Sequence, residues 1–250
     1  MARVNSPYGG MVHLNGNLLC AVDVETTGIK AGTHDLVQVA VLPLDSNIKP
    51  IKSIMPFYMN LTPTRLDNID YKACKVNKLT LSQMINQSMD KWKAADLFEE
   101  WFERLNLPVA ASHHKKLMPL WSNGSFDKSF LKEWLGDEGY DYFFHFHERD
   151  TQALALSIND RFYQMSEKLP FPKVGLNAIA AQFNIVNENA HDALSDCITT
   201  AEVYRQMLLM YQPVIPQSAP FTQEISCEDS SPESATPSQC SSSQCSSPSS

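Results

Sequence analysis

The 250-residue sequence lacks long hydrophobic runs and has no paired cysteines of the kind that bind zinc. No stretch approaches the roughly 18 consecutive apolar residues that a membrane-spanning helix requires. The first residues, MARVNSPYGGMVHLNGN, contain no apolar run of signal-peptide length. The six cysteines fall in apolar, helical or low-complexity contexts that favour reduced thiols. We therefore expect an intracellular, cytoplasmic setting and no membrane association.

Positive charge is also scarce: the sequence has 20 Lys and Arg but 28 Asp and Glu, which gives a net charge of −8. This balance argues against a polyanionic partner, since proteins that bind phosphates usually carry basic patches. About half of the acidic excess, however, lies near the carboxyl terminus, at Glu224, Glu228, Asp229 and Glu233. A site for divalent cations also needs clustered carboxylates. The acidity thus favours a short contact with any charged polymer over a long electrostatic groove.

The composition changes abruptly after Tyr211. Residues 213–250 are dominated by Ser, Pro and Gln, and such a segment cannot bury enough apolar surface to offset the entropy of ordering. We predict a disordered tail there, which either tethers a partner or has no role. Residues 18–212 are long enough for one domain, and residues 1–17 form an N-terminal extension.

Within residues 18–212 the hydrophobic patterns predict strands first and alternating helices and strands later. Strands are expected at 18–24, 35–44, 53–60 and 117–122, and helices near 98–105, 126–135, 176–183 and 192–211. Gly136 should end the second helix, and Asn184 is a suitable left-handed cap for the third. The order predicts an α/β fold with a mixed sheet, three antiparallel strands plus parallel ones, flanked by helices.

Two carboxylates, Asp23 and Glu25, end the first predicted strand in the segment VDVETTG. At a spacing of two, both side chains lie on one face of the strand. They would repel each other unless a cation lies between them, and oxygen ligands suit Mg²⁺ or Mn²⁺. A solvated strand end with two acids is about as probable on this pattern alone. The polar turn that follows, with Thr26 and Thr27, favours a functional site.

Two other segments carry candidate residues, although neither is informative alone. Asp127, in WSNGSFDKSFL, begins a predicted helix, where an acid commonly complements the helix dipole. His191 and Asp196, in HDALSDC, have a spacing expected about 0.8 times by chance in this composition. If His191 precedes the last helix and Asp196 lies one turn inside it, an imidazole stands beside a carboxylate. That arrangement suits a general base next to a metal ligand.

Together, and in this order, the segments resemble the three motifs of the DEDDh 3′→5′ exonuclease family, which has an RNase H-like fold. DVETTG matches the first motif without departure, and NGSFDKSFL matches the second, with Asn-Gly-Ser where many members have His-Asn-Ala. GLNAIAAQFNI followed by HDALSDC resembles the third, and Asp150–Thr151 resembles the start of the intervening helix. The resemblance spans Leu18 to Tyr211.

The resemblance implies hydrolysis with two ions of Mg²⁺ or Mn²⁺. Asp23 and Asp196 would bind the first ion together with Glu25, and Asp127 would help to hold the second. His191 would deprotonate the attacking water. A pair of metal ions about 3.5–4 Å apart stabilises the entering and leaving oxygens of an in-line displacement.

The terminal nucleotide would lie near four further residues, Thr26, Thr27, Asn123 and Phe126. Lysines and an arginine elsewhere are candidates for phosphate contact, namely Lys115, Lys116, Lys128, Lys132 and Arg161. The histidines in His113–His114 and His145-x-His147 lack zinc spacing and favour solvated or packing roles. The aromatic residues Trp92, Trp101 and Phe102 could stack on bases, but their helical spacing is more typical of a core.

These patterns lead to one main functional hypothesis and three alternatives. The main hypothesis is a 3′→5′ exonuclease that acts on single-stranded nucleic acid, with DNA slightly favoured over RNA. An exoribonuclease for short RNA is the first alternative, because no motif specifies contact with a 2′-hydroxyl. A proofreading or accessory subunit, tethered to a polymerase or another partner by the tail, is the second. A non-catalytic binding module is the third, but it would not need four acids and a histidine at these positions.

Overall fold

The computed structural model describes residues 11–78, 80–110 and 113–210. The chain divides into two units, Met1–Gln212 and Pro213–Ser250, and every described residue belongs to the first. The predicted tail at 213–250 and the first ten residues of the predicted extension lie outside the described residues. The domain boundaries therefore remain predictions.

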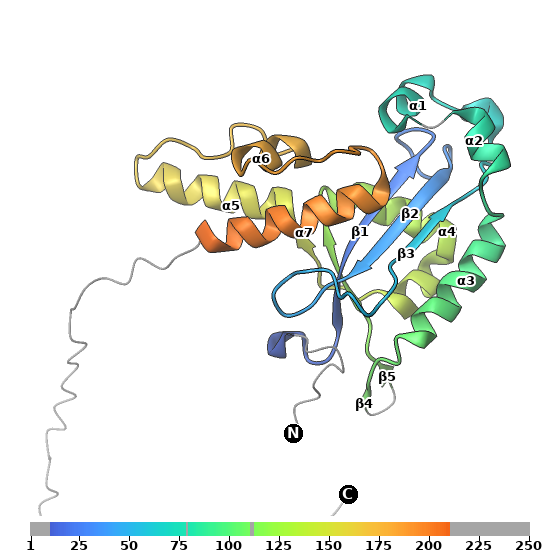
Figure 1. Cartoon of the computed structure of the whole chain (residues 1–250), viewed down its shortest axis with the longest axis horizontal. Helices are drawn as coiled ribbons and strands as arrows, with labels where there is room; N and C mark the ends of the chain where they lie inside the picture. The colour runs from blue at the N-terminus through green and yellow to red at the C-terminus, as the bar shows by residue number, and fades with distance from the viewer. Residues whose placement is uncertain (1–10, 79, 111–112, 211–250) are drawn as a thin grey trace, which may run out of the picture. The chain divides into compact units, whose positions relative to one another are not determined.

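A five-stranded mixed sheet lies at the centre of the described unit (Figure 1), in the order β3-β2-β1-β6-β7. The strands are β1 (Leu18–Thr26), β2 (Leu36–Pro43), β3 (Phe57–Asn60), β6 (Leu117–Trp121) and β7 (Arg149–Asp150). Strands β1, β2 and β3 are antiparallel neighbours, whereas β6 runs parallel to both β1 and β7. A separate two-stranded hairpin joins β4 (Val109–Ala110) to β5 (His113–His114). The predicted mixed sheet is confirmed.

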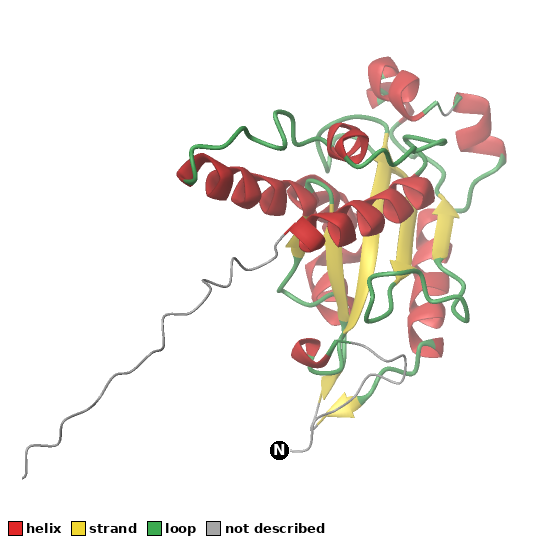
Figure 2. Ribbon diagram, turned by 60° about the vertical axis from the view of Figure 1, so that its left-hand side comes forward, coloured by secondary structure: helices red, strands yellow, loops and turns green. Residues whose placement is uncertain are grey.

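Helices cover both faces of the sheet (Figure 2). The helices are α1 (Tyr71–Asn77), α2 (Leu81–Asn86), α3 (Lys91–Arg104), α4 (Gly124–Phe143), α5 (Thr151–Gln164), α6 (Leu176–Gln182) and α7 (Ala193–Met210). Two 3₁₀ turns, Val12–Leu14 and Leu66–Asn68, complete the elements. Helices α3 and α4 pack on one face and α7 on the other, while α5 and α6 contact α7. Helix α1 lies beyond the carboxyl end of β1.

The structure differs from the expected elements at α4, at β5 and at the helices α1 and α2. The helix expected to end at Gly136 is interrupted there, with φ 75° and ψ 159°, but resumes and continues to Phe143. It resumes because Tyr140 and Phe143 pack into the same core as the preceding turns. His113–His114 forms a short strand that the hydrophobic patterns did not predict. The short helices α1 and α2 were not predicted, because neither repeats apolar residues at helical spacing over more than two turns.

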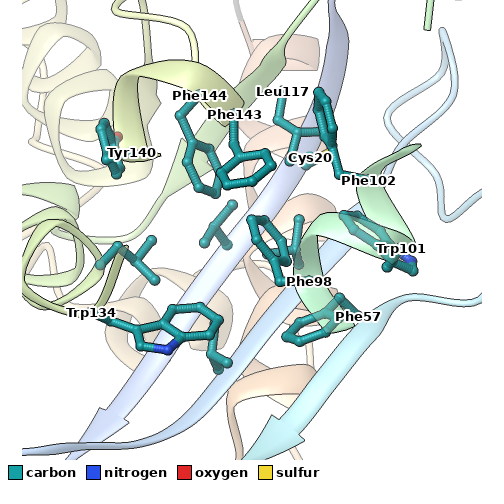
Figure 3. Close-up of a cluster of buried hydrophobic side chains, with 14 of the residues drawn as sticks. Cys20, Phe57, Phe98, Trp101, Phe102, Leu117, Trp134, Tyr140, Phe143 and Phe144 are labelled. Atoms are coloured by element: carbon teal, nitrogen blue, oxygen red, sulfur yellow. The ribbon is translucent and has the colours of Figure 1, made fainter. Parts of the chain in front are cut away.

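Strand β1 alternates between two hydrophobic clusters. Leu18, Cys20 and Val22 face α3 and α4, where they meet a cluster of aromatic rings (Figure 3). The rings belong to Phe57, Phe98, Trp101, Phe102, Trp134, Phe143 and Phe144. Leu19 and Ala21 face α7, whose contacting side chains are small: Ala193, Cys197 and Ala201. The residues of β1 that follow Ala21 in this alternation therefore lie on the α7 face of the sheet.

None of the helices in the described part of the chain is long and apolar enough to cross a membrane. The described cysteines, Cys20, Cys74 and Cys197, are all free, and Cys20 and Cys197 are buried.

Candidate active site

The carboxyl end of β1 carries Asp23 and Glu25 on the α7 face of the sheet. Val22 and Val24, which alternate with them, are buried in the aromatic cluster. Across the sheet Asp23 lies opposite Ala40, and Glu25 lies opposite Gln38 of β2. Glu25 retains 9% of its exposure, and Asp23 is partly exposed. The pattern of the strand thus places both carboxylates side by side, as the sequence predicted.

Asp127 reaches the same strand from α4. Its Oδ1 accepts the backbone N–H of Val24, between the two acids of β1, at 3.1 Å. The turn before α4 makes this possible, because Asn123 adopts a left-handed conformation with φ 74°. Gly124 fits directly over Trp121, where an added Cβ would lie 2.3 Å from the indole ring. The buried Asp127 side chain is therefore held at one place on the β1 backbone.

A second carboxylate held by hydrogen bonds comes from α7. Asp196 lies in the first turn of the helix and is 8% exposed. Its Oδ1 accepts a hydrogen bond from Asn187 Nδ2 at 2.5 Å, and its Oδ2 accepts the backbone N–H of His191 at 3.3 Å. His191 itself has a left-handed backbone, with φ 70°, two residues before the helix. Ligand atoms of Glu25, His191 and Asp196 all lie within 4.8 Å of one another.

The carboxylates strongly perturb one another's pKa values. Burial, followed by the charges of Asp196 and Asp127, raises the pKa of Glu25 to about 9. Burial also raises the pKa of Asp127 to about 8, although hydrogen bonds from backbone N–H groups partly oppose the shift. The pKa of Asp23 is raised well above its usual value by burial and by its four acidic neighbours, Asp127, Asp196, Glu25 and Asp192. Burial and mutual repulsion therefore both disfavour the charged forms of these carboxylates.

The donor set fits a hard divalent cation. Four carboxylates from β1, α4 and α7 offer oxygen ligands, which Mg²⁺ and Mn²⁺ prefer. A cation among them would offset the repulsion that raises their pKa values. The group of Glu25, His191 and Asp196 is the candidate metal site found among the described residues.

The carboxylates lie in a cleft of about 540 Å³, and three of the four predicted nucleotide contacts, Thr26, Asn123 and Phe126, also line it. Thr27 does not. Its side chain is fully buried, and its Oγ1 accepts the backbone N–H of Asp35 at 2.8 Å. The Thr27 hydroxyl therefore holds the turn after β1 and contributes no side chain to the lining of the cleft.

Part of the cleft lining comes from α1, which the sequence did not predict. Lys72, Val76 and Asn77 of this helix line the cleft, together with Asp70 and the exposed Ile29. The N-cap signal was present, because Asp70 accepts the backbone N–H of Lys72 at 2.8 Å. Such a cap is a recognisable start of a helix.

The cations predicted to contact phosphate do not line the cleft: Lys115, Lys116, Lys128, Lys132 and Arg161. Lys128 pairs with Glu148 at 3.1 Å, and Lys132 pairs with Asp137 at 2.8 Å. In the described lining of the cleft the lysine is Lys72.

The other candidates of the sequence also lie outside the cleft. Trp101 and Phe102 are buried in the aromatic cluster, and Trp92 is exposed beside α4. The ring of His145 stacks on Phe146, with 4.5 Å between the ring centroids, and its Nδ1 accepts the backbone N–H of His147 at 3.0 Å. His114 Nε2 donates to the carbonyl of Tyr142 at 3.1 Å. Trp101 and Phe102 therefore have packing roles, whereas Trp92 is solvated.

A mixed sheet between helices, with acids converging at the end of its central strand, defines a nuclease of the RNase H-like fold. The model of a family described as Exonuclease, RNase T, matches residues 20–204 of this chain. The chain belongs to this family and is a DEDDh-type 3′→5′ exonuclease, a hydrolase of phosphodiester bonds. The family uses divalent metal ions.

Relatives in sequence and structure are distant. An oligoribonuclease of Neisseria meningitidis serogroup A is 20% identical over 206 residues, which cover 79% of this chain and 95% of the relative. The zinc-bound complex of Escherichia coli exonuclease I with single-stranded DNA has a TM-score of 0.61 at 17% identity. That match covers 79% of this chain but 41% of the exonuclease I chain. Cell-death related nuclease 4 has a TM-score of 0.55 at 15% identity, over 78% of this chain and 64% of that one. At these identities the structural matches show the fold.

Proposed function

We propose that this protein removes nucleotides one at a time from the 3′ ends of single-stranded nucleic acid, with DNA slightly favoured over RNA. The observation that carries the proposal is the convergence of four carboxylates and one histidine in an open cleft. Three separate elements, β1, α4 and α7, supply these side chains.

In the proposed site Asp23, Glu25, Asp127 and Asp196 hold two ions of Mg²⁺ or Mn²⁺. When bound, such ions stabilise the negative charge on the entering and leaving oxygens of the phosphodiester. The protein fixes the ligands beforehand, because Asp127 is bonded to the β1 backbone and Asp196 to Asn187. Ligands that are already in place lower the cost of reorganisation during the reaction.

His191 is the proposed general base, which accepts the proton of the attacking water on an imidazole nitrogen. Imidazole is the side chain best suited to exchange protons near neutral pH, and such catalysis contributes about 10²–10⁴-fold. His191 stands beside Glu25 and Asp196 and is partly exposed, so that water can reach it.

The remaining walls suit a single strand better than a duplex. Ile29, Val76, Phe126 and Leu176 are apolar side chains that also line the cleft. Apolar and aromatic side chains contact unpaired bases without regard to sequence. We propose that the terminal base lies against this wall and that Lys72 meets the phosphate backbone.

RNA is the second candidate substrate, and the oligoribonuclease relatives favour it, because they match along 95% of their own length. The test uses 5′-labelled DNA and RNA oligomers of one sequence, incubated in parallel with the full-length protein. We expect a ladder of products shortened from the 3′ end with Mg²⁺ or Mn²⁺, none with EDTA, and faster shortening of DNA. Faster shortening of RNA would reverse the substrate preference. Absence of shortening of either polymer would overturn the proposal.

Two earlier predictions concern regions beyond the described residues or properties of the cell. The tail at 213–250 as a tether for a polymerase or another partner remains a prediction, as does the intracellular location.

A further inference from the structure

A closed set of hydrogen bonds connects β2 and β3 to the start of α7, outside the carboxylate cluster. Gln38 Oε1 accepts the backbone N–H of Ala193 at 2.7 Å, and Gln38 Nε2 donates to the Tyr58 hydroxyl at 2.9 Å. The Tyr58 hydroxyl donates in turn to Asp192 Oδ2 at 2.6 Å. The other oxygen of Asp192 accepts the backbone N–H of Ser195 at 3.0 Å. Each donor in this set therefore has a defined acceptor.

The hydrogen bonds end on the two residues that follow His191. His191 has a left-handed backbone, which is unfavourable for a residue with a Cβ and persists only where neighbouring contacts hold it. Asp192 and Ala193 supply such contacts on one side. On the other side Lys78 Nζ donates to the carbonyl of Ala190 at 3.2 Å. The backbone of His191 is thus held both before and after the residue.

Gln38 is an unusual residue for its place in the sheet. It is 4% exposed in the middle of a strand whose neighbours are apolar, and it lies opposite Glu25. A buried amide lowers stability unless its hydrogen bonds are made. Here they are made with Ala193, Tyr58 and Asn60. An apolar side chain would fill this place but could not accept the N–H of Ala193.

We propose that Tyr58 and Gln38 are positioning residues that act through Asp192 and Ala193 to fix the imidazole of His191 over the cleft. The proposal rests on the proposed role of His191 as general base. Neither residue lines the carboxylate cleft, so they would affect the rate without binding the substrate. Burial and the hydrogen bond to Asp192 raise the pKa of the Tyr58 hydroxyl, which keeps it a donor at neutral pH.

The test compares Tyr58→Phe with Tyr142→Phe in the full-length protein. Both tyrosines donate to a surface carboxylate, Tyr142 to Glu103 at 3.2 Å, and they are 37% and 42% exposed. Since a misplacement of about 1 Å can reduce rates about 10²-fold, we expect kcat of Tyr58→Phe to fall roughly tenfold. KM, Mn²⁺ affinity and Tm should stay close to wild type. Tyr142→Phe should leave all four unchanged.

A double-mutant cycle with His191→Ala separates positioning from a general loss of stability. If Tyr58 acts through His191, Tyr58→Phe should change kcat by less than about twofold in the His191→Ala background. An undiminished tenfold loss in that background, or equal kcat for Tyr58→Phe and wild type, would overturn the proposal.

Hydrogen exchange of the Ala193 amide distinguishes failure of this proposal from failure of the proposed function. Exchange should be faster in Tyr58→Phe than in wild type and unchanged in Tyr142→Phe. If wild type shortened no nucleic acid, the nuclease function would fail whatever the exchange result. If wild type is active but exchange in Tyr58→Phe is unchanged, only the positioning role fails.

Discussion

The two faces of the central sheet are built from side chains of very different size. The face toward α3 and α4 is filled with aromatic rings. The Phe98 ring is fully buried, and its centroid lies 5.0 Å from the ring centroids of both Phe57 and Phe143. The face toward α7 is lined mainly with alanine and cysteine near the site. Strand β1 contributes alternate side chains to both faces.

The difference shows how the fold separates stability from chemistry. Large rings bury much apolar area per residue and hold their helices at a distance from the sheet. Small side chains let α7 approach closely, so that Cys197 Sγ lies 3.6 Å from the carbonyl of Ala40. This approach brings Asp196 beside Glu25. The aromatic face therefore stabilises the fold, and the small-residue face lets carboxylates that repel each other lie close together.

The largest expected effect on activity comes from removing one carboxylate on the α7 face of the sheet. Asp23→Ala should reduce activity by roughly 10³-fold or more, because a metal ligand is worth several kcal/mol of transition-state stabilisation. The same change should raise Tm of the metal-free protein, since it relieves repulsion from neighbouring carboxylates. Oligomer shortening and thermal unfolding in EDTA provide the two measurements. Asp137→Ala, which alters an exposed acid, is the control. Substantial activity in Asp23→Ala would exclude Asp23 as a ligand.

Replacing one buried alanine on each face of the sheet with leucine tests the roles of the two faces directly. Ala201, on α7, and Ala94, on α3, are 1% and 0% exposed. Replacing either with Leu should lower the free energy of unfolding by about 1–3 kcal/mol, because both sites are already filled. Only Ala201→Leu should also reduce kcat by roughly tenfold or more, since it displaces the helix that carries Asp196. Urea unfolding and kcat at a temperature where both variants are folded measure these effects. Equal losses of kcat would show that the faces are not specialised.

The smallest expected effect is the dependence of stability on pH without metal. Glu25 and Asp127 have ordinary pKa values of 4.5 and 3.8, which the fold raises to about 9 and about 8. Between these limits the folded protein binds protons that the unfolded chain has released, so stability falls as pH rises. Tm in EDTA should therefore be lower at pH 8 than at pH 5.5, and Mg²⁺ should reduce the difference.

Asp127→Asn should flatten this dependence, whereas Asp137→Asn should leave it unchanged. A metal-free Tm that increases from pH 5.5 to pH 8 would contradict repulsion among the acids.

Much of the site could be predicted because local patterns determine it. Alternation along β1 placed Asp23 and Glu25 on one face, and Asp127 and Asp196 lie in the first turns of their helices. The resemblance to known motifs then joined segments that are far apart in the sequence. These features depend on short-range geometry, which a sequence displays.

The parts of the site that could not be predicted depend on which side chains already bond to other residues in the folded protein. Thr27 lies within the first motif, yet its hydroxyl is used by Asp35. Lys128 and Lys132 lie one and five positions after Asp127, but neither lines the cleft, and they pair with Glu148 and Asp137 instead. The wall formed by α1 was missed because a seven-residue helix without an apolar stripe has little periodicity to detect.

The one-residue alternation along β1 has a consequence for how this protein can change over evolution. Val22 and Val24 point into the core, while Asp23 and Glu25 point into the site. Losing or gaining a single residue upstream would exchange the two sets, because register in a strand has a period of two. Substitutions in this segment can be tested one by one by selection, but insertions and deletions would remove the chemistry and the core together. We therefore expect homologues to vary in the length of their loops, and to keep the length of this strand fixed.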